Sequence, residues 1–192
     1  MRLGNLAILT LRDAGAAMRV LRGLDLPMPA RWMALFLAIV LSRILGVLLT
    51  ILLPVPTDDP LSHMLQQPLT MAGIQLAGTV LSAVLVVRIG RMFGGTGNFA
   101  DALLAIAWIE LVLVAVQVVQ IAMLLLLPAT AALVGTFAAM LSIYLTVTMT
   151  KALHGFRSAL MVALVYFGFS LLLGLALMQI MPEMFMPPEV LQ

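Results

Sequence analysis

The glycine-rich segment Gly90–Gly97 is the first candidate for chemistry, because glycine loops bind phosphate in many nucleotide-binding proteins. Gly90 and Gly95 have the spacing of a phosphate loop, but Thr96 stands where the essential Lys would be. A strand pattern is also missing before the segment. The glycines instead predict a tight turn that lets two helices approach closely.

Other residue types that could do chemistry are poorly placed for it. Asp58 and Asp59 are adjacent in a Pro-bounded turn, which is more typical of a solvated turn than of an acid–base pair. The chain has no Cys, and no serine stands in a nucleophile motif. A group of methionines near the C-terminus lacks the neighbouring Cys or His that would favour copper binding; these are Met178, Met181, Met184 and Met186. We predict no enzymatic activity and no metal or other cofactor.

The composition places most of the chain in a lipid bilayer. Of its 192 residues, 64% are hydrophobic and 9% are charged, whereas soluble domains carry about 25% charged residues. Five stretches reach the roughly 20 apolar residues that a membrane helix needs, namely 31–53, 69–89, 101–127, 129–150 and 158–181. They lack the period-two alternation of barrel strands. The predicted fold class is all-α, a polytopic membrane protein with five transmembrane helices in a compact bundle.

Basic residues predict how these helices are oriented. Lys and Arg precede the first stretch and occur between the second and third and between the fourth and fifth, but not in the alternate connections. The positive-inside rule therefore predicts a cytoplasmic N-terminus and an extracytoplasmic C-terminus. The net charge of +2 then reflects topology rather than nucleic-acid binding. His63 and His154 fall on opposite sides of the membrane and cannot share a metal.

The predicted transmembrane domain, residues 30–182, has a short segment on either side. Residues 183–192 form an extracytoplasmic tail, and residues 1–29 form a cytosolic or interfacial segment. Within 6–24, apolar residues follow helical spacing, while Arg12, Arg19 and Arg22 fall on another face. This pattern predicts an amphipathic helix whose arginines face anionic lipid headgroups. The alternative is a short cytoplasmic helix that packs on the bundle.

Two short motifs stand in the predicted cytosolic turns. The first contains Gly94, Gly95 and Gly97 between two phenylalanines; the second is Leu153-His154-Gly155-Phe156, followed by Arg157. With the five-span plan, they resemble the Yip-one (Ypt-interacting protein) domain family over about residues 6–181. Eukaryotic members of that family are linked to Rab-type GTPases and vesicle traffic. This chain looks more like the bacterial branch, which implies a location in the bacterial inner membrane.

Several polar residues lie inside the predicted spans. Arg43 is about 12 residues inside the first span, or roughly 18 Å deep, and an unpaired arginine there costs ~2.5–3.5 kcal/mol or more. Glu110 of the third span lies at a similar depth, so we predict an Arg43–Glu110 pair. Glu110, Gln117 and Gln120 form a polar stripe on one helix face, and we expect Gln75 to hydrogen-bond with Gln120.

Two functions fit these features. The first is a Yip-type membrane protein whose cytosolic face recruits partners or organises lipid. The alternative is a small transporter, scramblase or permease subunit that uses the polar stripe. Small residues at every fourth position favour close helix packing, including packing between two copies in a homodimer; they are Ser42, Gly46, Thr50 and Ala131, Gly135, Ala139.

Overall fold

A computed structural model describes residues 3–52 and 67–180, and every regular element in this part of the chain is an α-helix. Five helices are long and apolar enough to cross a bilayer, which confirms the predicted all-α, five-span fold. Two short helices, α1 (Leu3–Arg12) and α2 (Ala14–Gly23), precede them. The long helices are α3 (Met28–Leu52), α5 (Pro68–Met92), α6 (Phe99–Leu126), α7 (Pro128–His154) and α8 (Ala159–Ile180).

Some predicted features lie outside the described residues. They are the Asp58–Asp59 turn, His63, the tail at 183–192 and the methionines from Met181 onward.

The ends of the long helices follow local sequence rules. Pro68 and Pro128 stand in the first turns of α5 and α7, where a missing backbone N–H costs nothing. Asn98 caps α6, because its side chain accepts a hydrogen bond of 2.8 Å from the Asp101 amide. Gly155 ends α7 with a φ of 72°, a left-handed conformation that favours glycine.

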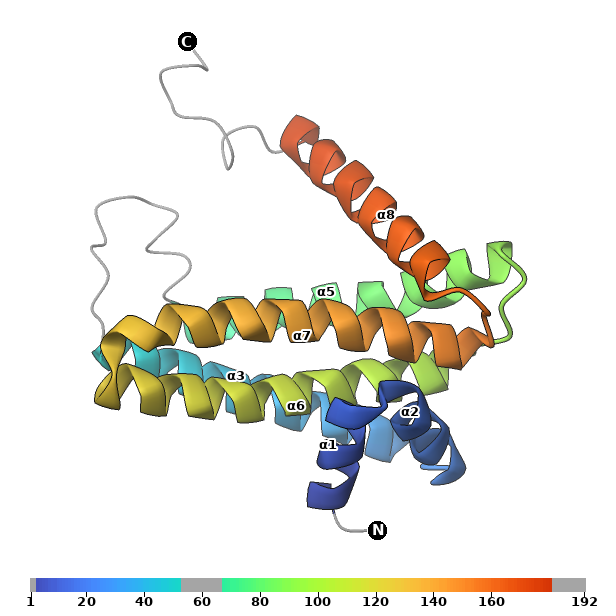
Figure 1. Ribbon diagram of the computed structural model, residues 1–192. Helices are drawn as coiled ribbons and strands as arrows, with labels where there is room; N and C mark the ends of the chain where they lie inside the picture. Colours follow the sequence, from blue (N-terminus) through green and yellow to red (C-terminus); the bar gives the residue numbers. More distant parts are fainter. Residues whose placement is uncertain (1–2, 53–66, 181–192) are drawn as a thin grey trace. The chain divides into compact units, whose positions relative to one another are not determined.

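The chain forms two compact units, residues 1–157 and 158–192. In the first unit, α6 packs against α3, α5 and α7, so that it occupies the centre of the bundle (Figure 1). Its residues Ala102, Leu103 and Ala107 are fully buried. The second unit contains α8, which is apolar along its whole length.

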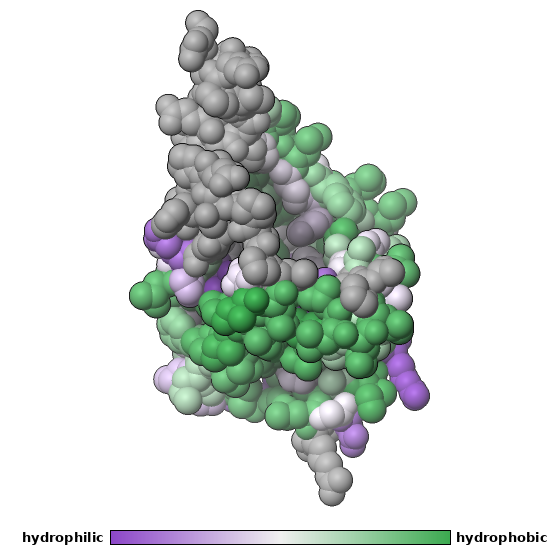
Figure 2. Space-filling view, turned by 90° about the vertical axis from the view of Figure 1, so that its left-hand side faces the viewer, coloured by the Kyte–Doolittle hydropathy of each residue, from purple (hydrophilic) through white to green (hydrophobic). Residues whose placement is uncertain are grey.

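Hydrophobic side chains dominate the outside of these helices. Phe36 and Ile44 on α3, Ile74 on α5 and Val118 on α6 are all exposed, and the side of the molecule in Figure 2 is mainly hydrophobic. Exposure of this kind is expected where lipid, rather than water, surrounds the helices.

The N-terminal segment differs from the single amphipathic helix predicted for residues 6–24. It is divided at Asp13, whose carboxylate accepts a hydrogen bond of 2.8 Å from the Ala16 amide and so caps α2. Helix α2 packs against α6 and α7 and buries Met18 and Leu21. The segment therefore packs on the bundle through α2.

Candidate functional site

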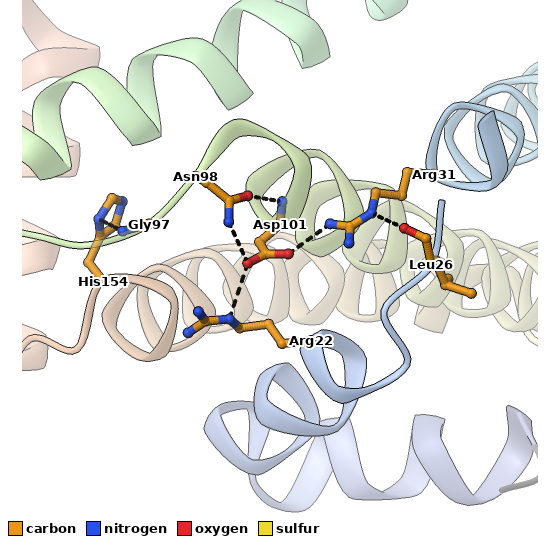
Figure 3. A network of polar contacts seen from close by, with 7 residues as sticks. All are labelled: Arg22, Leu26, Arg31, Gly97, Asn98, Asp101 and His154. Atoms are coloured by element: carbon orange, nitrogen blue, oxygen red, sulfur yellow. Dashed lines mark hydrogen bonds and ion pairs between the residues drawn. The ribbon is translucent and has the colours of Figure 1, made fainter. Parts of the chain in front are cut away.

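Most of the polar side-chain contacts that join different helices lie at one end of the first unit, which we call the basic end. It consists of α1, α2, the first turns of α3 and α6, the last turns of α5 and α7, and the turn at 93–98 (Figure 1). Most basic residues of the chain lie here, namely Arg12, Arg19, Arg22, Arg31, Arg88, Arg91, Lys151 and Arg157. Two polar clusters hold its elements together (Figure 3).

The first cluster surrounds His154 at the end of α7. Its Nδ1 accepts a hydrogen bond of 3.1 Å from the Gly97 amide, and its Nε2 lies 3.1 Å from the Val86 carbonyl oxygen. A carbonyl only accepts and an amide N–H only donates, so these two contacts are both hydrogen bonds when Nε2 carries the proton and Nδ1 does not. The ring thus joins α7 to α5 and to the turn at 93–98 as a neutral imidazole.

Glycines make room for this ring. A Cβ at Gly90 or Gly95 would lie 2.3 Å from ring atoms of His154, and one at Gly97 would lie 2.6 Å away. Arg91 supports the same turn, because its Nε donates to the Gly97 carbonyl at 3.3 Å. The two sequence motifs, Gly94-Gly95-Thr96-Gly97 and His154-Gly155, therefore meet in one histidine–glycine cluster (Val86, Gly90, Gly95, Gly97, His154).

The second cluster surrounds Asp101 in the first turn of α6. Arg31 Nη1 lies 2.7 Å from Oδ1, Arg22 Nε lies 3.1 Å from Oδ2, and Asn98 Nδ2 donates to Oδ2 at 3.0 Å. Arg31 Nε also donates to the Leu26 carbonyl at 2.7 Å. The Arg31 and Asp101 side chains are only 7% and 10% exposed. This aspartate cluster (Arg22, Arg31, Asn98, Asp101) ties α2, α3 and α6 together.

Sequence reasoning missed the aspartate cluster. Arg22 was predicted to face lipid headgroups, and no contact between helices was predicted for Asp101 or Arg31. The sequence did contain a signal for this cluster. Asp101 stands at the start of an apolar helix, while Arg22 stands at the end of the N-terminal segment and Arg31 at the start of the first span. Arg22 still exposes 43% of its side chain, but its guanidinium is used by Asp101.

The remaining predicted residues at this end are exposed to different degrees. Arg12 and Arg157 are exposed, and Arg19 is an exposed partner of Asp13 at 3.9 Å. Gly94 has a φ of 81°, and Gly155 ends α7. None of these takes part in the two clusters.

A separate hydrogen bond fixes α1 on α6. Trp108 Nε1 donates to Thr10 Oγ1 at 2.8 Å, and the same hydroxyl donates to the Leu6 carbonyl at 2.8 Å. Thr10 is fully buried. Both polar groups are therefore satisfied within the hydrophobic contact between these helices.

The polar residues inside the membrane are arranged differently from the prediction. No direct ion pair joins Arg43 to Glu110 in the described part of the chain. Glu110 Oε2 instead accepts a hydrogen bond of 3.2 Å from Gln75 Nε2. Gln75 thus binds Glu110, where we expected Gln120, because α5 packs beside this part of α6.

Two atoms of this group have no hydrogen-bond partner among the described residues. They are Arg43 Nε and Gln75 Oε1, both of which are buried. The Arg43 guanidinium makes only a long contact of 3.5 Å with Ser42 Oγ. Farther along α6, Gln117 is half-buried, and Gln120 packs against Gly135 of α7, where a Cβ would lie 3.0 Å from its Nε2. The predicted stripe therefore faces two different neighbours.

These features define a polytopic α-helical integral membrane protein whose helices are joined at one end by two polar clusters. The family model of the Yip1 domain matches residues 8–181. The chain therefore belongs to the Yip1 domain family, whose members are generally non-enzymatic membrane proteins. No curated protein and no solved structure matches the chain.

Proposed function

We propose that this protein is a non-enzymatic member of the Yip1 domain family that recruits partners or organises the membrane through its basic end. The observation that carries the proposal is that both motif segments and the aspartate cluster fix the shape of this end. We place the protein in the bacterial inner membrane, as the resemblance to the bacterial branch of the family implies. We place the basic end in the cytoplasm, because the Lys and Arg residues are gathered there.

The turn beside the histidine–glycine cluster has the composition of a binding surface. Met92 and Phe93 are exposed there. Arg91, which precedes them, and Arg157, which follows His154 by three residues, are also exposed. Aromatic residues, Met and Arg are enriched in protein interfaces. A turn held rigid by His154 loses little conformational entropy when a partner binds, which favours affinity.

Crosslinking in native membranes tests partner recruitment. We expect the double variant Met92→Ala/Phe93→Ala to lose crosslinked neighbours, while Leu69→Ala, an exposed residue at the opposite end of α5, keeps them. Charge reversal at Arg12 and Arg19 extends the test to the N-terminal helices. If every captured neighbour survives all of these changes, the recruiting surface is not at the basic end.

Transport is a second candidate function. It is favoured by buried atoms inside the membrane that have no hydrogen-bond partner among the residues at 3–52 and 67–180. Buried polar groups without partners call for an explanation such as a bound water, ion or substrate, and ionisable residues inside a membrane often mark transport paths. Arg43 Nε and Gln75 Oε1 are such atoms, beside the Glu110 carboxylate. A small transporter, scramblase or permease subunit would use this group.

Flux in reconstituted vesicles tests this second candidate. Glu110→Gln and Arg43→Leu should each abolish flux of the transported lipid, proton or solute, while the exposed Thr50→Val control should not. Folded protein that moves none of these substances would rule the transport function out.

A further inference from the structure

The aspartate cluster provides a reference level for the membrane. It contains three charged groups, Arg22, Arg31 and Asp101, which belong at the polar headgroup level rather than among acyl chains. Trp108 follows Asp101 by seven residues on the same helix, which corresponds to about 10 Å along the axis. Trp108 therefore lies about 10 Å closer to the membrane centre than the aspartate cluster. Tryptophan is enriched at this boundary between headgroups and hydrocarbon.

The length of α6 agrees with this placement. Its 28 residues extend about 42 Å, whereas the hydrocarbon core is about 30 Å thick. About 12 Å of the helix must therefore lie outside the core. Asp101 is charged and lies in the first turn of α6, so the length outside the core is at the basic end.

Helix α1 is held at the level of Trp108. The 2.8 Å hydrogen bond between Trp108 Nε1 and Thr10 Oγ1 fixes the distance between the two helices. Figure 1 shows that α1 lies beside α6 at a point farther into the bundle than the first turn of α6. With ten residues, or about 15 Å, α1 is too short to cross the membrane. It can only lie within one leaflet or on its surface.

The outer face of α1 is mainly apolar, although Asn5 is also exposed on this helix. Leu6 and Thr10 face the bundle, whereas Leu3, Ile8 and Leu11 are 75%, 53% and 51% exposed. Arg12 at the end of α1 and Arg19 on α2 are exposed beside this face. An apolar face bordered by arginines is the pattern of a helix that sits 5–10 Å into the headgroup–acyl boundary.

We propose that α1 is embedded in the leaflet at the basic end, with Leu3, Ile8 and Leu11 against lipid acyl chains and with Arg12 and Arg19 at headgroup phosphates. The partner of this surface is the lipid of the bilayer that the protein spans. The proposal deepens the membrane-organising part of the proposed function, and it rests on the basic end lying at a membrane surface. A helix embedded in one leaflet makes the protein sensitive to lipid charge and curvature.

Site-directed spin labelling tests the depth of α1, and the absence of Cys allows labels at single introduced cysteines. The full chain carrying Ile8→Cys or Leu11→Cys is placed in vesicles of phosphatidylethanolamine and phosphatidylglycerol. Access to oxygen, which concentrates in the bilayer, is compared with access to a water-soluble nickel chelate. Arg19→Cys serves as the headgroup-level control, and Ile44→Cys on α3 as the deep control.

We expect labels at Ile8 and Leu11 to be several-fold more accessible to oxygen than to nickel, at a depth between the two controls. Nickel access equal to that at Arg19 would overturn the proposal, because the face would then meet water and suit a soluble partner. Exclusion of both reagents would also overturn it, because protein would then cover the face. Neither result affects the crosslinking at Met92 and Phe93, so the two proposals fail separately.

A second variant tests the role of the hydrogen bond. Thr10→Val keeps the shape of the side chain and removes the acceptor for Trp108. We expect the label at Ile8 to become more mobile and to gain nickel access, while the label at Ile44 stays unchanged. An unchanged depth at Ile8 would show that this bond does not position α1.

Discussion

The aspartate cluster at the basic end and the polar group in the membrane interior differ in how completely their side chains are paired. In the aspartate cluster, Asp101 has three side-chain partners and Arg31 also bonds to a backbone carbonyl. In the interior, Arg43 and Gln75 each keep a buried atom without a partner in the described residues. The difference indicates that the basic end is a rigid structural unit, whereas the interior group contributes little to holding the helices together.

Loss of Asp101 should have the largest effect on stability. Asp101→Ala leaves Arg31 buried without its carboxylate, and breaking a buried ion pair in this way costs about 3–5 kcal/mol. Thermal unfolding in detergent measures the effect. Asp13→Ala serves as the comparison, because it loses an exposed ion pair and a helix cap worth only about 0.5–2 kcal/mol. Equal unfolding temperatures for the two variants would contradict the comparison.

Enlargement of Gly95 should have the next largest effect. A Cβ there would lie 2.3 Å from His154 Nδ1, and overpacking of this kind costs about 1–3 kcal/mol. The control is Gly78→Ala in α5, where nothing lies within 4 Å of the added Cβ and where alanine favours the helix by up to about 1 kcal/mol. Gly95→Ala should therefore unfold at a lower temperature than the native chain, and Gly78→Ala should not.

Removal of both polar contacts of the His154 ring should have an effect of about the same size. His154→Phe loses the hydrogen bonds to Gly97 and Val86, at about 1–3 kcal/mol for the backbone groups left unsatisfied. Hydrogen exchange of the Gly97 amide reports the change directly, and it should become faster. Continued protection of that amide would mean that the ring does not hold the turn.

Replacement of Arg43 should have the smallest effect on stability. Arg43→Leu removes a buried donor that has no partner among the described residues and leaves the Gln75–Glu110 hydrogen bond in place. Because an unpaired polar group is costly in lipid, we expect a change within about 1 kcal/mol, or a gain. A loss as large as that of Asp101→Ala would show that Arg43 is also a structural centre.

The amino-acid sequence by itself determined the membrane-spanning architecture. Long apolar segments cannot be solvated by water and must form helices in lipid, so composition alone identified the five spans. The Asn98 cap is also a local feature, since capping depends on residues a few positions apart. Hydropathy and helix capping depend on residues that are close together in the sequence, which is why both can be predicted from the sequence alone.

Only the tertiary structure decided which polar residues meet. Seventy positions separate Arg31 from Asp101, and 98 separate Thr10 from Trp108. Gly97 and His154, which are joined by a hydrogen bond, lie in two different elements, the turn at 93–98 and the end of α7. Depth along a span favoured Arg43 as the partner of Glu110, but depth does not specify the rotation of a helix about its axis. That rotation places Gln75 against Glu110, because side-chain packing among α3, α5 and α6 fixes the faces that touch.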